Sequence, residues 1–164
     1  MKILDQNLLD QLCTQAASRD RKRINHNFHD SENDIVQRMC NALQLGTYVQ
    51  PHRHLSPAKP EFFLVLQGRA YILLFDDHGK VLERVELDAH GPVRAAEIPQ
   101  GAWHTIGALS GDTVVFEVKP GPYLPTSDKD FAPWAPREGE PEAQTTEKWF
   151  QTASVGALPP NFGL

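Results

Sequence analysis

Residues 61–121 read EFFLVLQG, RAYILLFDDHG, KVLERVELDAHG, PVRAAEIPQG, AWHTIGALSGD and TVVFEVKPG when the sequence is divided at its turns. Each of these segments holds a short run of β-branched, aromatic and other apolar residues and closes at a glycine turn. No helical periodicity separates them, whereas a parallel sheet would need crossover helices at these points. The regular spacing therefore predicts an all-β domain, a sandwich or barrel of antiparallel strands.

The length and composition fit one globular domain. The 164 residues are 40% hydrophobic and 23% charged, which is enough for one core and too little for two. Acidic residues outnumber basic ones by 21 to 16, so we expect no nucleic-acid partner. The apolar runs are short, and we expect no signal peptide, no membrane association and a cytoplasmic location. Cys13 and Cys40 lack CxxC spacing, and we interpret both as reduced and structural.

The region before the repeated strands predicts a helix followed by extended chain. Residues 5–18 place apolar side chains on one stripe at helical spacing, and Asp5 is a suitable N-cap. Residues 23–29 and 35–45 each read as strands, and residues 48–54 as a further strand-like run.

The composition changes beyond Lys119, where most of the 13 prolines occur together with several large aromatic residues. Since large aromatic side chains are rarely left in water, this tail is predicted to wrap the barrel, with a short helix near 142–152. We divide one structural domain into three regions: 1–30 with the helix and first extended segment, 31–120 with the barrel core, and 121–164 with the tail.

A pair of histidines, His52 and His54, follows a strand-like run. In extended chain, positions i and i+2 project from the same face, so both imidazoles can point to one place. Glu61 begins the next strand, and His104 follows a tight turn on a later strand, so both can reach that place. Imidazole and carboxylate donors together suit Fe, Mn, Ni, Cu or Zn. We favour a metal site over four separate packed or solvated side chains.

These residues carry a resemblance to a known superfamily. The segment GTYVQPHRHLSPAKPEFFLVLQG (46–68) resembles the first cupin motif, and HGPVRAAEIPQGAWHTIGA (90–108) resembles the second. The resemblance implies a jelly-roll β-barrel and assigns His52, His54, Glu61 and His104 as metal ligands. The loop between His54 and Glu61 is longer than in the usual motif. Ala108 stands where the second motif ends in asparagine, which is not a ligand.

A wider resemblance covers nearly all of residues 2–136. It rests on RKRINHNFHDSENDIVQRMCNALQLGTYVQPHRH, IPQGAWHT, VVFEVKPGPY and KDFAPWAP, which resemble the WbuC-type cupin-fold metalloproteins. The resemblance implies a cupin barrel with a bound metal, encoded among genes for surface-polysaccharide (O-antigen) biosynthesis. No reaction is assigned to that family, so the resemblance leaves the chemistry open.

Several polar residues precede the histidine pair. Asn27 and His29 share one face of an extended segment, and Gln37 and Arg38 follow on the next. One interpretation makes them a substrate-binding wall for an oxygen-rich ligand, with Arg38 as a fork for a carboxylate or phosphate. The other makes them an exposed strand face beside a solvated turn. Both interpretations stay open at this point.

The leading functional hypothesis is a metal-dependent cupin enzyme of isomerase or oxygenase type. Its substrate would be a small oxygenated metabolite such as a sugar derivative, and Glu61 is the candidate catalytic base. The cofactor would be one divalent transition metal ion: Fe, Mn, Ni or Zn. The alternative is a non-catalytic ligand-binding or regulatory module organised by its metal. We also expect a homodimer.

Overall fold

The computed structural model describes residues 1–124 and 129–160. Within these residues the elements follow in chain order as α1 (Gln6–Ala17), β1 (Arg23–Asn27), β2 (Val36–Leu43), β3 (His52–Arg53), β4 (Glu61–Gln67), β5 (Arg69–Phe75), β6 (Val81–Asp88), β7 (Ala95–Ile98), β8 (Trp103–Ala108), β9 (Thr113–Pro120), β10 (Asp130–Phe131) and α2 (Pro141–Thr152). All six segments between residues 61 and 121 contain the predicted strand. The strand predicted within residues 48–54 comprises only the two residues of β3 in the structure. Strand β10 was not predicted from the sequence.

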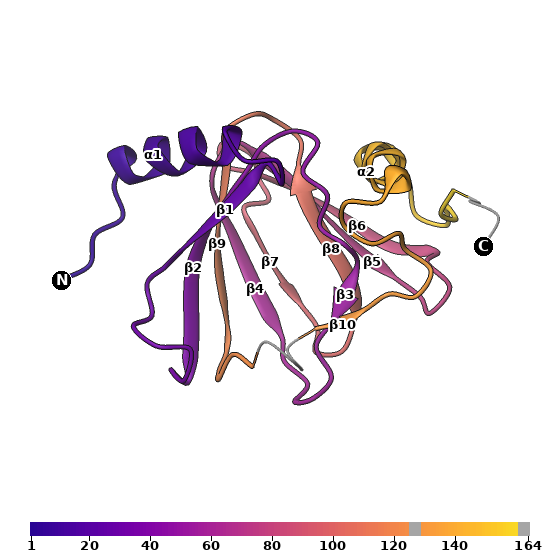
Figure 1. Ribbon diagram of the computed structural model, residues 1–164, viewed down its shortest axis with the longest axis horizontal. Helices are drawn as coiled ribbons and strands as arrows, with labels where there is room; N and C mark the ends of the chain where they lie inside the picture. Colours follow the sequence, from indigo (N-terminus) through magenta and orange to yellow (C-terminus); the bar gives the residue numbers. More distant parts are fainter. Residues whose placement is uncertain (125–128, 161–164) are drawn as a thin grey trace.

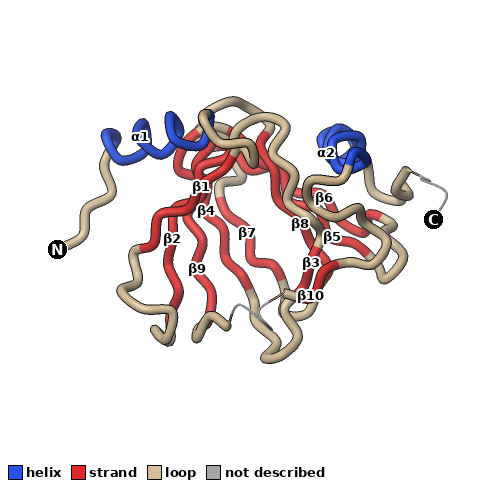
Figure 2. Tube along the Cα trace, in the orientation of Figure 1, coloured by secondary structure: helices blue, strands red, loops and turns tan. Residues whose placement is uncertain are grey.

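The strands form two antiparallel sheets that face each other (Figure 1). One sheet has the order β1-β2-β9-β4-β7, and the other has the order β10-β3-β8-β5-β6. Figure 2 shows the strands of both sheets between the two helices. Apolar side chains from both sheets fill part of the space between them, and those that are buried are Leu43, Phe63, Val65, Ala70, Ile72, Leu87, Ile98, Ile106, Ala108 and Val115. The predicted all-β fold is confirmed.

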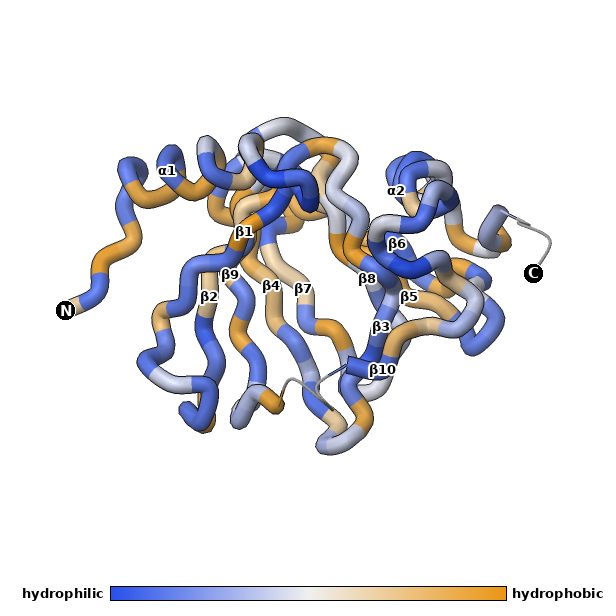
Figure 3. The backbone as a smooth tube through the Cα atoms, viewed as in Figure 1, coloured by the Kyte–Doolittle hydropathy of each residue, from blue (hydrophilic) through white to orange (hydrophobic). Residues whose placement is uncertain are grey.

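Helix α1 covers the outer face of the first sheet. Its N-cap is Asp5, whose Oδ1 accepts a hydrogen bond from the Leu8 amide at 2.9 Å, as the sequence predicted. Figure 3 shows apolar and polar residues mixed along α1, and its buried residues pack against Cys40, Ala42 and Val114. Because side chains alternate along a strand, β2 and β9 direct their other residues into the sandwich.

Helix α2 and the described tail residues near it cover the outer face of the second sheet, in keeping with the predicted short helix and the packing of the tail on the barrel. Phe150 lies against Phe75 with ring centroids 5.8 Å apart, and Tyr71 and Leu73 belong to the same apolar cluster. Arg84 of β6 donates hydrogen bonds to the carbonyl oxygens of Phe150 and other residues at the C-terminal end of α2. A cation stabilises this end of a helix.

Neither α1 nor α2 combines the length and apolar character needed to cross a membrane, and they are the helices found in residues 1–124 and 129–160.

Candidate metal centre

The predicted ligands converge from three strands of the sandwich. His52 lies on β3 directly opposite His104 of β8, Glu61 begins β4, and His54 follows the end of β3. All four side chains are buried, and one donor atom from each lies within 4.8 Å of the others. The longer loop between His54 and Glu61 therefore does not prevent the carboxylate from joining the histidines.

The alternation of β3 and β8 separates the histidines from their neighbours. Arg53 and Trp103 project away from the histidine cluster, and the Arg53 guanidinium carbon lies 4.1 Å from the centroid of the Trp103 ring. The indole nitrogen of Trp103 donates a hydrogen bond to Asp77 Oδ1 at 2.9 Å. The cation–π contact between Arg53 and Trp103 joins β3 to β8 on the face opposite the histidines.

Backbone carbonyls fix the ring orientation of two histidines. His52 Nδ1 donates to the carbonyl oxygen of Gln50 at 3.0 Å, and His104 Nδ1 donates to that of Ala102 at 2.9 Å. With the proton on Nδ1, each Nε2 presents a lone pair, which is the form that binds a metal.

The short distance between His104 Nε2 and the Glu61 carboxylate is evidence for a cation-binding site. His104 Nε2 is buried and forms no hydrogen bond of acceptable geometry with any residue the structure describes. It nevertheless lies 2.9 Å from Glu61 Oε2. A nitrogen lone pair and a carboxylate oxygen repel each other at this distance unless a cation lies between or beside them. The donor set therefore fits a divalent transition metal ion.

Two further charged side chains complete the polar cluster. Glu61 Oε1 lies 3.0 Å from His54 Nε2 and accepts a hydrogen bond from Lys119 Nζ at 3.0 Å. Lys119 Nζ also lies 3.0 Å from Glu117 Oε1, and Asn41 donates from its amide to Glu117 Oε2 at 2.7 Å. A single ammonium group thus bridges two buried carboxylates.

The surroundings shift the pKa values of His52 and Glu61, two of the four candidate ligands, in the direction that metal binding requires. Burial lowers the pKa of His52 well below its ordinary value, and the charge of Lys129 lowers it further, so the imidazole is neutral. Burial raises the pKa of Glu61, but the net shift is well below the ordinary value, and the positive charge of Lys119 is the largest influence that lowers it. Burial raises the pKa of Glu117.

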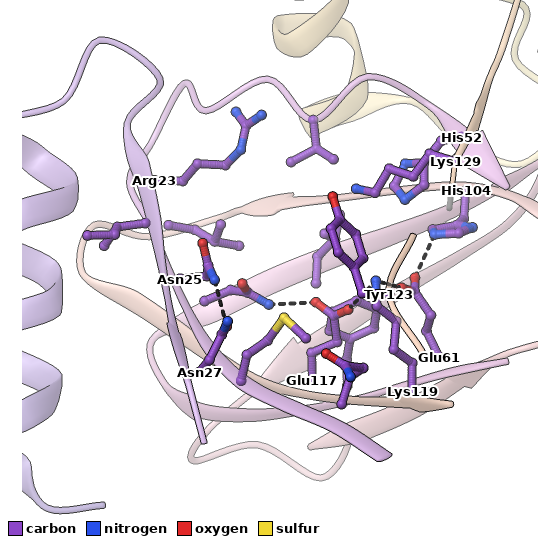
Figure 4. Close-up of a pocket in the computed structure, with 18 of the residues that line it drawn as sticks. Arg23, Asn25, Asn27, His52, Glu61, His104, Glu117, Lys119, Tyr123 and Lys129 are labelled. Carbon is purple, nitrogen blue, oxygen red and sulfur yellow. Dashed lines mark hydrogen bonds and ion pairs between the residues drawn. The ribbon is translucent and has the colours of Figure 1, made fainter. Parts of the chain in front are cut away.

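The cluster borders a cavity of about 440 Å³. His52, Glu61 and His104 line one part of it, and Arg23, Asn25 and other residues of β1 and β2 line another (Figure 4). Tyr123, from the loop after β9, lines the same cavity. A polar cavity with charged side chains beside a metal-ligand cluster suits a small, oxygen-rich molecule.

The structure brings three of the four predicted substrate residues to the cavity. Asn27, His29 and Gln37 line it. The amide nitrogen of Gln37 donates to backbone carbonyls of the preceding turn, the shortest contact being 2.8 Å to Asp34. His29 Nδ1 accepts a hydrogen bond from the Arg38 amide at 3.0 Å. Both side chains therefore also hold local backbone in place.

Arg38 is absent from the cavity lining among the residues that the structure describes. Its guanidinium lies on the outer face of β2, 3.6 Å from Asp34 Oδ2. Adjacent residues of a strand point to opposite faces, so Gln37 and Arg38 cannot both contribute to one wall. The predicted substrate-binding wall therefore keeps Asn27, His29 and Gln37 and loses Arg38.

The sequence reasoning missed Glu117 and Lys119. Both are buried on β9 and share the inward face with Val115. The signal was present, because two charged residues at positions i and i+2 of an otherwise apolar strand share one face.

Comparison with protein families identifies the chain. The model of a domain of unknown function, DUF6016, matches residues 4–87, which is about half of the 164 residues. The chain belongs to the DUF6016 family. The match includes β1 to β5 and the first three residues of the metal-ligand cluster, His52, His54 and Glu61. The comparison with curated proteins gave no match.

Solved structures with cupin-like folds resemble this DUF6016 protein. The capsular polysaccharide assembling protein CapF from Staphylococcus aureus is 25% identical with a TM-score of 0.54, over 69% of this chain and 32% of CapF. A CapF complex with 3-isopropenyl-tropolone has a TM-score of 0.57 at 22% identity, over 70% of this chain and 32% of that one. The TT1209 protein from Thermus thermophilus has a TM-score of 0.52 at 21% identity. The match covers 73% of this chain and 97% of TT1209. The chain thus spans about a third of CapF, and the predicted cupin-like sandwich is confirmed.

Proposed function

We propose that this DUF6016 protein is a metal-dependent cupin enzyme of the WbuC type that acts on a small oxygenated metabolite such as a sugar derivative. One observation carries the proposal. Three buried histidines and a carboxylate bring their donor atoms within 4.8 Å of one another beside a cavity of about 440 Å³. A catalytic metal site combines protein ligands with room for a substrate, and this arrangement provides both.

The chain supplies the ligands and their orientation. His52, His54, His104 and Glu61 would hold Fe, Mn, Ni or Zn, which at such a site provides Lewis-acid or redox chemistry. The carbonyl groups behind His52 and His104 hold two of the rings in place. Lys119 keeps Glu61 ionised, as both a metal ligand and a catalytic base must be.

Two likenesses support a role in surface-polysaccharide biosynthesis. The WbuC-type proteins that the sequence resembles are encoded among such genes. CapF, to which the fold is similar, is described as a capsular polysaccharide assembling protein. We therefore propose a sugar or a sugar-derived acid as the substrate.

A non-catalytic binding module is the second candidate, and one observation favours it. Both oxygens of Glu61 already have close partners, because His54 and Lys119 contact Oε1 and His104 contacts Oε2. A carboxylate held on both oxygens is suited to a fixed structural site.

Turnover assays distinguish the two candidates. Metal-loaded protein is incubated with hexoses, hexuronates and sugar 1-phosphates, and chromatography with mass spectrometry detects isomerised or oxidised products. The enzyme proposal predicts that wild type converts one of these compounds and that His104→Ala does not. Metal-dependent binding without conversion of any compound would instead establish the binding module.

A further inference from the structure

Glu117 presents a buried oxygen atom that is ion-paired with Lys119 but accepts no hydrogen bond of acceptable geometry from the described residues. The residue is 7% exposed and lines the cavity. Asn41 donates to Oε2, but Oε1 accepts no hydrogen bond of acceptable geometry from the described part of the chain, although Lys119 Nζ lies 3.0 Å away. A carboxylate oxygen can accept more than one contact, so Oε1 on the cavity wall, although paired with Lys119, keeps room for a hydrogen bond from a ligand.

The position of Glu117 relates this oxygen to the metal centre. Met39 and Phe63 lie opposite it on the neighbouring strands β2 and β4, so it belongs to the row of side chains next to that of Glu61. Lys119 bridges the two carboxylates. Figure 4 shows Glu117 and Glu61 on the same side of the cavity. A ligand group at the metal centre thus has Glu117 beside it.

Other side chains of the cavity indicate the class of ligand. Asn25, Asn27 and Asn41 add amide groups, which both donate and accept hydrogen bonds, as hydroxyl groups do. Tyr123 contributes an aromatic ring among them (Figure 4). The C–H face of a sugar ring packs against such a ring, while its hydroxyl groups meet the polar side chains.

We propose that Glu117 Oε1 accepts a hydrogen bond from a hydroxyl group of a sugar bound with a neighbouring oxygen at the metal centre. The proposal rests on the proposed function and specifies it further. Glu117 is a ligand-binding residue that selects compounds with adjacent hydroxyl groups. Asn41 is a positioning residue that orients the Glu117 carboxylate through their hydrogen bond at 2.7 Å.

Calorimetry with metal-loaded protein tests this assignment. The probes are glucose, galactose, mannose, their uronates and their 1-phosphates, followed by the monodeoxy analogues of whichever probe binds. Wild type is expected to bind at least one probe and to lose about tenfold in affinity for one deoxy analogue, since a hydrogen bond to a charged group is lost. Glu117→Met is expected to bind the parent sugar and that analogue equally.

Metal content by mass spectrometry is measured on the same samples, because the proposal requires the Glu117 variants to retain the metal. Glu117→Gln keeps the shape of the side chain and decides the test if Glu117→Met does not fold. Glu117→Gln is expected to bind the parent sugar about tenfold more weakly than wild type does. Glu97→Gln, on the exposed outer face of β7, is the matched control and should bind as wild type does.

Each contrary result has a distinct meaning. Unchanged selectivity in the Glu117 variants overturns the role of this residue. Loss of metal from Glu117→Gln overturns it as well, because Glu117 would then support the metal rather than the sugar. If metal-loaded wild type binds none of the probes, the sugar class is overturned while the metal centre stands. If wild type takes up no metal, the proposed function itself fails.

Discussion

Glu61 is the residue on which the charge balance of the site depends. It is buried together with Glu117 and a lysine that bridges the two carboxylates, Lys119, on the wall of the cavity. Two carboxyl groups lie close together there, and burying negative charge without compensation is unfavourable. A divalent cation among the histidines would compensate this negative charge. The four clustered donor groups are consistent with a metal site.

Gly107 of β8 allows close packing against Tyr71 of β5. A Cβ atom there would lie 2.2 Å from the hydroxyl oxygen of Tyr71 on β5. We predict that Gly107→Ala lowers the free energy of unfolding by about 1–3 kcal/mol, because the buried tyrosine cannot move aside freely. Urea denaturation measures this change. Gly111→Ala is the control, since its nearest contact would be an ordinary 3.8 Å; equal effects of the two substitutions would refute the packing argument.

Glu138 ties the tail to the start of β1. It accepts hydrogen bonds from Arg21 at 2.7 and 2.8 Å and from Arg23 at 2.8 Å. Burial raises the pKa of Glu138, but the hydrogen bonds from Arg21 and Arg23 outweigh it, and the net shift is downward. A carboxyl group with a lowered pKa stabilises the folded state above its unfolded pKa, and this contribution is lost as the pH falls through the folded value.

We therefore predict a pH-dependent effect of Glu138→Gln. The variant should be about 1 kcal/mol less stable than wild type at neutral pH, a small value because Arg21 and Glu138 are partly exposed. The difference should shrink below about pH 4. Urea unfolding at both pH values measures it, with the exposed Glu83→Gln as control. A difference of the same size in acid would contradict the ion-pair account.

At the scale of elements, strand alternation explains both what the sequence predicts and what it leaves out. His52 and His54 share a face, and Trp103 faces away from His104, as the period of two predicts. The same rule excludes Arg38 from the cavity once Gln37 faces inward. That choice of face depends on which sheet surface α1 covers, and this is a tertiary contact that the local pattern of β2 does not contain.

Strand β3 is only two residues long, so its attachment to β8 needs support beyond backbone pairing. The contact between Arg53 and Trp103 provides it on the face opposite the ligands. We predict that Arg53→Ala weakens zinc affinity about tenfold although it removes no ligand, because outer residues orient those that bind. Competition with a chelating dye measures this affinity. An affinity equal to that of wild type, or of the exposed control Arg94→Ala, would contradict the prediction.

At the scale of the whole molecule, the sequence predicts strands but not their neighbours. The glycine-bounded segments locate β4 to β9, yet β9 pairs with β2 and β4 rather than with β8. Such long-range pairing follows from burial in the complete fold, which local periodicity does not encode. The cavity wall from β1, β2 and Tyr123 depends on this pairing, so it could not be predicted residue by residue.

The tail is predicted to be part of the folding unit. Tyr71, Leu73 and Phe75 are buried beneath it on the outer face of β5. We expect a chain ending after Gly121 to expose this surface and to aggregate or to lose its cooperative unfolding transition. Size-exclusion chromatography and thermal denaturation test this. A soluble truncated chain with the wild-type transition would show that residues 1–121 fold alone. The expected homodimer remains a prediction for sedimentation analysis.

Metal content per chain is the measurement that tests the central claim most directly. Wild type, His52→Ala, His104→Ala and Glu61→Ala are purified without chelator or nickel affinity and analysed by mass spectrometry, with His78→Ala in an exposed turn as control. The account predicts about one transition metal ion per chain in wild type and in the control, and its loss in the histidine variants. Wild type that holds no metal after reconstitution with Fe, Mn, Ni or Zn would contradict it.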